Sequence, residues 1–210
     1  MSIIKLNNNG VKNATAFGSI TGLGSMTFIK KLTASSSSTL SFVDGSSSVV
    51  LDNTYKEYLF TFNNIHPASD IPEFQFNMST DTGSNYNVTK TTTLFKARLS
   101  EANNIQELGY EAGSDLAQST NFQSFTYAGI RNEDDASLSG TLHIFNPSST
   151  TFTKHFISKC NYMSKSGSTS VTYNSFISGY GNTTSAVDAI QFKMSTGNID
   201  AGDICLYGIA

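Results

Sequence analysis

The sequence contains no tryptophan, only three prolines and two cysteines, and few charged residues. Lys, Arg, Asp and Glu make up 14% of the chain, against about 25% in an average globular protein, and the formal net charge is −3. This balance argues against a strongly basic nucleic-acid-binding protein, a coiled coil and a bundle of long helices. Disorder is also excluded, because 15 Phe and 9 Tyr residues give the chain enough apolar surface to bury a core.

The scarcity of cysteine and the absence of long apolar runs bear on where the chain folds. Cys160 and Cys205 could form one bridge only, which is too few for a disulfide framework. We expect both to be buried free thiols, because an unpaired cysteine packs as a small hydrophobe. The first ten residues lack the apolar stretch of a secretory signal, and no run approaches the ~18 residues of a membrane span. We therefore predict folding in a reducing cytosol and no membrane span.

Neutral polar residues take the place of the missing charges: the chain has 31 Ser, 24 Thr and 19 Asn. About ten short segments alternate apolar and polar residues with a period of two, separated by turn sequences such as Asp44-Gly45. We therefore predict an all-β fold, an antiparallel β-sandwich of jelly-roll type over residues 38–210. A single short helix is expected near residues 105–112. The side chains predicted to face inward are Phe42, Phe60, Phe62, Phe76, Leu142, Ile144, Phe192, Ile204 and Leu206.

One short pattern occurs twice. Residues 75–80 read QFNMST and residues 191–196 read QFKMST. Two copies are too few for a solenoid, which needs at least three units. The copies are either equivalent strands in the two halves of a double Greek-key sandwich or similar only because strands share the same chemistry.

The charges are distributed unevenly along the chain. The first acidic residue is Asp44, and the four lysines before it give a formal +4, which leaves −7 on the rest. The serine run at residues 35–38 is typical of a flexible linker. We predict that residues 1–37 form an attachment arm and linker, although residues 1–33 could instead be the first strands of the sandwich. The predicted attachment residues are Ile3, Ile4, Lys5, Leu6, Lys12, Phe17, Phe28, Lys30 and Lys31.

Catalytic and metal-binding motifs are missing from the sequence. The three histidines are too dispersed for a zinc signature, and there is no nucleophile elbow or phosphate-binding glycine loop. The acidic run Glu133-Asp134-Asp135 reads as a solvated turn, and residues 81–85 lack the spaced acids of a calcium loop. A triad assembled by folding stays open. We predict a protein that is not an enzyme and that uses no metal or cofactor.

Sugar binding is a subtler alternative. Tyr86, Tyr110, Tyr173 and Tyr180 fall in polar, loop-like stretches, where an exposed ring could form a platform for a glycan. The competing interpretation is that these rings cap sheet edges or fill subunit contacts. The sequence favours the second interpretation without deciding between them.

Several stretches, spread over nearly the whole chain, resemble virion structural proteins of marine bacteriophages, particularly phages of cyanobacteria. Members of that group are usually described only as structural or tail-fibre-like proteins, so the resemblance implies a lineage and assigns no functional residues. The stretches are IIKLNN at 3–8, GVKNATAFG at 10–18, YKEY at 55–58, NIHPA at 64–68, IFNPSST at 144–150, TGNIDAG at 196–202 and LYG at 206–208.

The resemblance and the composition together predict a phage virion structural protein. It would be an outward-facing fibre, collar or tail component, attached to the particle through its N-terminal arm. The alternatives are a capsid decoration protein and a glycan- or receptor-binding module at a fibre tip. The expected partners are other virion proteins, further copies of the chain in a closed oligomer, preferably a trimer, and a host-surface glycan. The expected location is the virion, after synthesis in the host cytoplasm.

Overall fold

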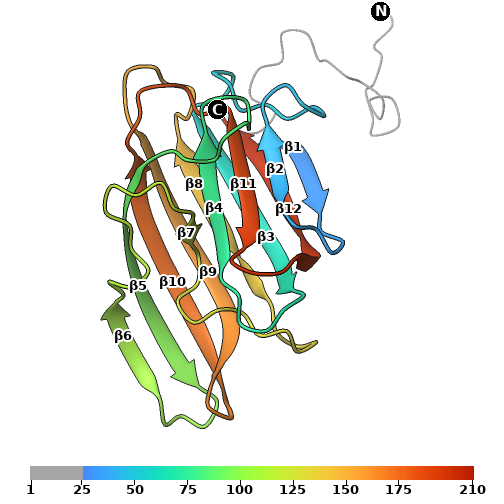
Figure 1. Cartoon of the computed structure of the whole chain (residues 1–210), viewed down its shortest axis with the longest axis vertical. Coiled ribbons are helices and arrows are strands. Elements are labelled where there is room, and N and C mark those ends of the chain that lie inside the picture. The colour runs from blue at the N-terminus through green and yellow to red at the C-terminus, as the bar shows by residue number, and fades with distance from the viewer. Residues whose placement is uncertain (1–25) are drawn as a thin grey trace, which may run out of the picture.

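The structure is a computed structural model that describes residues 26–210, and this part of the chain contains twelve strands and no helix. Two antiparallel sheets pack face to face as a β-sandwich, with the smaller sheet in front of the larger one in Figure 1. The strands are β1 (Met26–Thr33), β2 (Leu40–Val43), β3 (Glu57–Pro67), β4 (Phe74–Ser79), β5 (Lys90–Ser100), β6 (Gln106–Tyr110), β7 (Gln123–Ser124), β8 (Leu138–Phe145), β9 (Lys154–Ser166), β10 (Thr169–Gly181), β11 (Ala189–Met194) and β12 (Ile199–Ile209).

The strand order shows that the chain passes repeatedly from one sheet to the other. The eight-stranded sheet has the order β1-β12-β3-β8-β9-β10-β5-β6, and the four-stranded sheet has the order β2-β11-β4-β7. Strands β2, β4, β7 and β11 therefore lie in the small sheet, while the strands between them in the sequence lie in the large sheet. This arrangement confirms the all-β class and the antiparallel sandwich.

The core lies between the sheets and follows from the alternation in the sequence. Along β9 the side chains alternate between buried and exposed positions over most of the strand, because successive residues point to opposite faces. All nine side chains predicted to face inward are at most 1% exposed. Phenylalanines from both sheets meet at this interface: Phe62 of β3 packs against Phe74 and Phe192, with ring centroids 5.3 and 5.4 Å apart.

The repeated sequence pattern corresponds to two neighbouring strands. Residues 75–80 lie mainly in β4 and residues 191–196 mainly in β11, and these strands pair in antiparallel register with Phe76 opposite Phe192. The two copies therefore form the centre of the small sheet. Their glutamines, Gln75 and Gln191, are both half-buried on its outer side.

The helix expected near residues 105–112 is absent, and that prediction was wrong. Residues Gln106–Tyr110 form β6, which pairs with β5 so that Tyr110 lies opposite Phe95 and Leu108 opposite Ala97. The segment is short and alternates the apolar Leu108 and Tyr110 with Glu107 and Gly109, so it can add a strand to the edge of the sheet. Pairing with β5 outweighs the local preference for a turn of helix.

Part of the predicted arm and linker is paired with the sandwich. Strand β1 pairs with β12 along its whole length, and the serine run is hydrogen-bonded to the start of β12, with Ser36 N donating to Asp200 O at 3.0 Å and Ser37 N to Ile199 O at 2.8 Å. Residues from Met26 onward thus belong to the sandwich, because their backbone groups find partners in β12. This agrees with the alternative interpretation for residues 26–33.

Both cysteines are free and buried, as predicted. Cys160 points into the core, and burial raises the pKa of its thiol to about 12. Cys205 lies between the inward-facing Ile204 and Leu206 and so points to the other face of the large sheet. The sheet itself therefore separates the two sulfur atoms.

Candidate functional site

The predicted attachment residues divide into two groups. Ile3, Ile4, Lys5, Leu6, Lys12 and Phe17 lie outside the described residues. Phe28, Lys30 and Lys31 lie in β1 at the edge of the large sheet. Phe28 is 56% exposed and packs edge-to-face on Tyr207 with ring centroids 5.6 Å apart.

Lys31 already has an acidic partner within the chain. Its Nζ lies 3.2 Å from Asp203 Oδ2, and Thr33 Oγ1 donates to Asp203 Oδ1 at 2.5 Å. The hydrogen bonds from Thr33 and Lys31 lower the pKa of the Asp203 carboxyl. Both side chains are partly exposed, so the ion pair contributes little stability. The Asp203 carboxylate nevertheless offsets the positive charge of Lys31, which is one of the predicted attachment residues.

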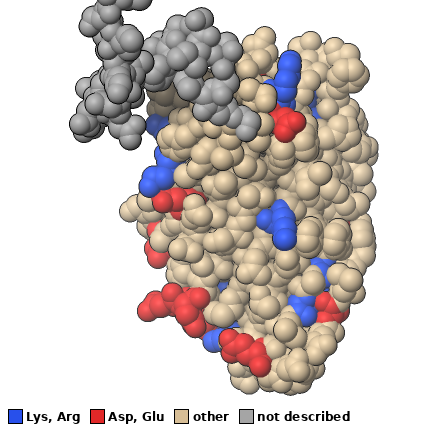
Figure 2. Space-filling view, turned by 180° about the vertical axis from the view of Figure 1, so that it is seen from behind, with Lys and Arg blue, Asp and Glu red and all other residues tan. Residues whose placement is uncertain are grey.

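The outer face of the large sheet carries more exposed apolar surface than the predicted attachment strand. Figure 2, which views the molecule from behind, shows a surface that is mostly uncharged, with most charged groups toward its edges and lower part. Four side chains on β5 and β6 are exposed: Phe95 (43%), Leu99 (44%), Leu108 (76%) and Tyr110 (55%). Phe176 of β10 stacks on Phe95, with centroids 4.9 Å apart and ring planes at 7°. We call these five residues the apolar patch.

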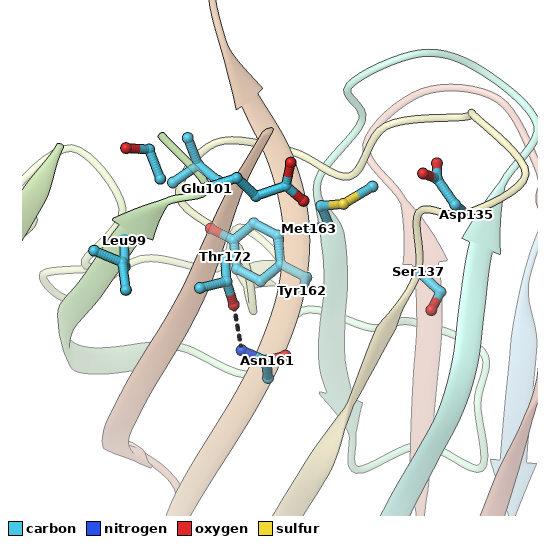
Figure 3. Close-up of a pocket in the computed structure, with 10 residues that line it drawn as sticks. Leu99, Glu101, Asp135, Ser137, Asn161, Tyr162, Met163 and Thr172 are labelled. Carbon is cyan, nitrogen blue, oxygen red and sulfur yellow. Dashed lines mark hydrogen bonds between the residues drawn. The ribbon is translucent and has the colours of Figure 1, made fainter. Parts of the chain in front are cut away.

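A groove of about 420 Å³ adjoins the apolar patch through Leu99. In the view of Figure 3, Met163 lies between the carboxylates of Glu101 and Asp135, which come from the end of β5 and from the loop before β8. Asn161 Nδ2 already donates to Thr172 Oγ1 at 3.0 Å and to Tyr173 O at 2.9 Å. The Asn161 amide is thus already hydrogen-bonded within the sheet, and we regard the groove as a continuation of the apolar patch.

The acidic segments singled out in the sequence are held by the protein's own groups. Glu133 accepts hydrogen bonds from Arg131 and Lys165, which lower the pKa of its carboxyl to about 2. Asp81 accepts from Ser79 and Asn85, and the same hydrogen bonds lower its pKa to about 2. Within residues 26–210 no group of three or more His, Cys, Asp or Glu side chains could hold a metal ion. No helix in that range is long and apolar enough to cross a membrane.

The four tyrosines considered as sugar platforms do not form a common surface. Tyr173 is 2% exposed and stacks on Tyr162, with centroids 5.2 Å apart. Tyr110 belongs to the apolar patch, and its hydroxyl donates to Asp115. Tyr86 and Tyr180 are half-buried on separate elements.

A polar pocket of about 430 Å³ lies on the outer face of the small sheet. Its floor is one row across three strands, with Lys193 of β11 opposite Gln75 of β4 and Gln75 opposite Ser124 of β7. Glu73 extends the floor and accepts a hydrogen bond from Gln75 Nε2 at 3.0 Å. The wall is formed by residues of the loop between β6 and β7 (residues 111–122), among them Asp115, Leu116, Asn121 and Phe122.

The middle of this loop is anchored by a buried hydrogen-bond network. Thr92 Oγ1 donates to Gln123 Oε1 at 2.5 Å, and Leu116 N donates to Thr92 Oγ1 at 2.8 Å. Gln123, which is fully buried, donates through Nε2 to Ser114 O at 3.0 Å. Because Ser114 and Leu116 both line the pocket, these bonds fix the wall relative to the sheet.

Two buried lysines of β5 anchor the two ends of the same loop. Lys90 Nζ donates to Asn77 Oδ1 at 2.5 Å, and Asn77 Nδ2 in turn donates to Thr120 O at 2.9 Å. Burial lowers the pKa of Lys90 to about 7. At the other end, Lys96 Nζ pairs with Glu111. Burial alone would lower the pKa of Lys96, but Glu111 and the nearby negative groups outweigh it and raise the pKa.

No pattern in the sequence predicts this pocket. Two of its floor residues, Gln75 and Lys193, come from the two copies of the repeated pattern, and its wall comes from residues 111–122, of which only the first two fall within the predicted helix. The lysines and amides that hold it look like ordinary solvated polar residues in the sequence. Only Phe122 and the Gln75/Gln191 repeat could have drawn attention to these strands.

Comparisons with known proteins complete the description of the chain. A scan against protein-family models, a search of curated proteins and a search of solved structures each returned no match.

Proposed function

We propose that this protein is a structural component of a bacteriophage virion, an outward-facing fibre, collar or tail subunit located on the particle. The observation that carries the proposal is the strand order of the sandwich, read together with the resemblance of the sequence to phage structural proteins. Jelly-roll sandwiches are common in viral capsid and lectin domains.

The strand order fits a jelly roll with additions. Counting β2 as the first of the eight strands and β11 as the last, the small sheet places the first strand beside the last, the last beside the third and the third beside the sixth. In the large sheet, β3 is the second strand, β5 the fourth and β6 the fifth. When the meander β8–β10 is counted as the seventh strand, the second lies beside the seventh, the seventh beside the fourth and the fourth beside the fifth. Strands β1 and β12 extend the edge next to β3. We infer a jelly roll in which the three-stranded meander β8–β10 replaces a single strand and so adds two strands.

The apolar patch supports assembly from several copies of the chain. Aromatic side chains bury 150–250 Å² each and leucines somewhat less, so these two aromatic and two leucine side chains, each about half exposed, leave on the order of 300–400 Å² of surface. That is about half of the ~800 Å² per partner in a standard interface, and it lies on a face with little charge. We propose that a second copy covers this patch and that the contact closes a ring of three, the threefold preference being an analogy with other fibres and spikes.

A substitution on the apolar patch tests this assembly. Leu108→Asp places a charge where the partner copy would bury a leucine, so we expect a wild-type oligomer at ~20 µM and a shift toward monomer for the variant. Light scattering after size exclusion measures both. Phe152→Asp is the matched control, because Phe152 is 69% exposed but lies outside the patch. A monomeric wild type, or an oligomer that tolerates Leu108→Asp, would contradict the proposal.

The virion role itself is tested on particles of the phage that carries this sequence. Mass spectrometry of gradient-purified particles should detect peptides of the chain at a fixed ratio to the major capsid protein. Antibodies against the recombinant protein should then label one part of the particle in electron micrographs, which separates a fibre, collar or tail component from a capsid decoration protein. Detection in lysates but not in purified particles would overturn the proposal.

A further inference from the structure

Several hydrogen-bonding groups of the polar pocket are not used up by contacts within residues 26–210. Gln75 donates one side-chain N–H to Glu73, so its carbonyl oxygen and its second N–H are left for a ligand. The Glu73 carboxylate also keeps lone pairs that can accept further hydrogen bonds. Lys193 has three donors and, within residues 26–210, no carboxylate in ion-pair range; its Nζ lies 4.5 Å from the centroid of the Phe122 ring. The pocket therefore combines a donor, an acceptor and an amide that supplies both.

The lining also restricts the chemistry of the ligand. An apolar molecule would leave these polar groups unpaired, which is costly for each group that loses water. The formal charges of Glu73, Asp115 and Lys193 sum to −1, which disfavours an anion. A neutral polyhydroxylated molecule can donate to the carboxylates and accept from Lys193, while its C–H face packs against Phe122 and Leu116. The volume of about 430 Å³ falls within the ~300–1,000 Å³ usual for small-ligand sites.

The pocket is also rigidly built before any ligand arrives. The loop that forms its wall is fixed by buried groups at three places: Lys96 at its start, the Thr92–Gln123 network in its middle, and Asn77 with Lys90 at its end. Thr92 and Lys96 are 5% and 2% exposed, and Asn77, Lys90 and Gln123 are fully buried. A preformed site loses less entropy on binding, which matters most for weakly bound ligands such as single sugars.

We propose that the polar pocket beneath the loop of residues 111–122 binds a neutral saccharide unit of a cell-surface glycan. The inference deepens the proposed function and rests on it for the source of the glycan. Sugar binding itself belongs to the isolated protein, so it can be tested without the particle.

The experiment uses ¹⁵N-labelled full-length protein titrated with neutral monosaccharides such as galactose, glucose and N-acetylglucosamine, with sialic acid and phosphate as anionic probes. We expect at least one neutral sugar to shift amide signals of the loop and of β4 and β11 at millimolar concentration. Gln75→Ala should weaken that binding roughly three- to tenfold through the loss of its hydrogen bonds, and Phe122→Leu should weaken it through the loss of the ring. Gln191→Ala is the matched control, since Gln191 occupies the equivalent place in the repeat but lies outside the pocket.

Each outcome decides the proposal. Binding that is lost in Gln75→Ala and Phe122→Leu but kept in Gln191→Ala supports it, provided that thermal melts show all three variants folded. No shift with any neutral sugar, shifts only with the anionic probes, or equal losses in all three variants would overturn it. If the protein is present in particles but binds no sugar, only the proposed saccharide site is contradicted. If it binds sugar but is absent from particles, only the proposed virion role is contradicted.

Discussion

Phe192→Ala is expected to lower the free energy of unfolding by about 3–5 kcal/mol, a large part of the ~5–15 kcal/mol that holds a typical domain together. Phe192 is fully buried at the centre of the small sheet and contacts aromatic rings contributed by both sheets. Removing its ring leaves a cavity that the surrounding rings cannot all fill. The rings within 6.3 Å of its centroid are those of Phe42, Phe60, Phe62, Phe74 and Phe125.

Urea unfolding followed by circular dichroism measures this loss. Phe152→Ala serves as the control, because Phe152 is 69% exposed and its truncation should change stability by no more than about 0.5 kcal/mol. Phe192→Leu should lose less than half as much stability as Phe192→Ala, since the leucine side chain fills part of the cavity. A loss below about 1 kcal/mol for Phe192→Ala would show that the aromatic cluster is not the centre of the core.

Lys90→Met is expected to change how stability depends on pH. Burial lowers the pKa of Lys90 from 10.5 to about 7, so between these values the folded state releases a proton that the unfolded chain keeps. The wild type should therefore become more stable as pH rises from 7 toward 10, by at most about 1.4 kcal/mol per pH unit from this group. The contribution is complete above pH 10.5 and is lost as pH falls to 7. The Lys90→Met variant should lack this slope.

The comparison between the two proteins is essential because another group titrates in the opposite direction. Burial raises the pKa of the Cys160 thiol from 9.0 to about 12, which lowers stability as pH rises above 9, but equally in both proteins. Urea unfolding at pH 7, 8.5 and 10 gives the difference between wild type and variant. Parallel curves would show that Lys90 keeps its ordinary pKa. The variant should also loosen the loop near Thr120, seen as faster amide exchange there, because Lys90 orients the Asn77 side chain that holds it.

The class of the fold and the identity of the core could be predicted from the amino-acid sequence alone. Period-two alternation in segments such as residues 58–62 places Tyr58, Phe60 and Phe62 on one face, and only a sheet packed against a second layer can bury such a face. The free, buried state of the cysteines also followed from local chemistry alone. These properties depend on which residues alternate and not on which strands become neighbours.

The neighbours of each strand, and the sites that these neighbours create, could not be predicted from local sequence and depend on long-range pairing. Pairing with β12 incorporates residues 26–33 into the sandwich, and pairing with β5 makes residues 106–110 a strand, because backbone groups at a sheet edge gain partners that local propensity does not reveal. The burial of Lys90 and Lys96 depends on carbonyl, amide and carboxylate partners that lie up to 15 residues away along the chain. The polar pocket joins Glu73 and Gln75 to Lys193, more than a hundred residues later in sequence, through the register of β4 with β11. Such long-range register is set by the packing of the whole core, so the pocket exists only once the two sheets have closed on each other.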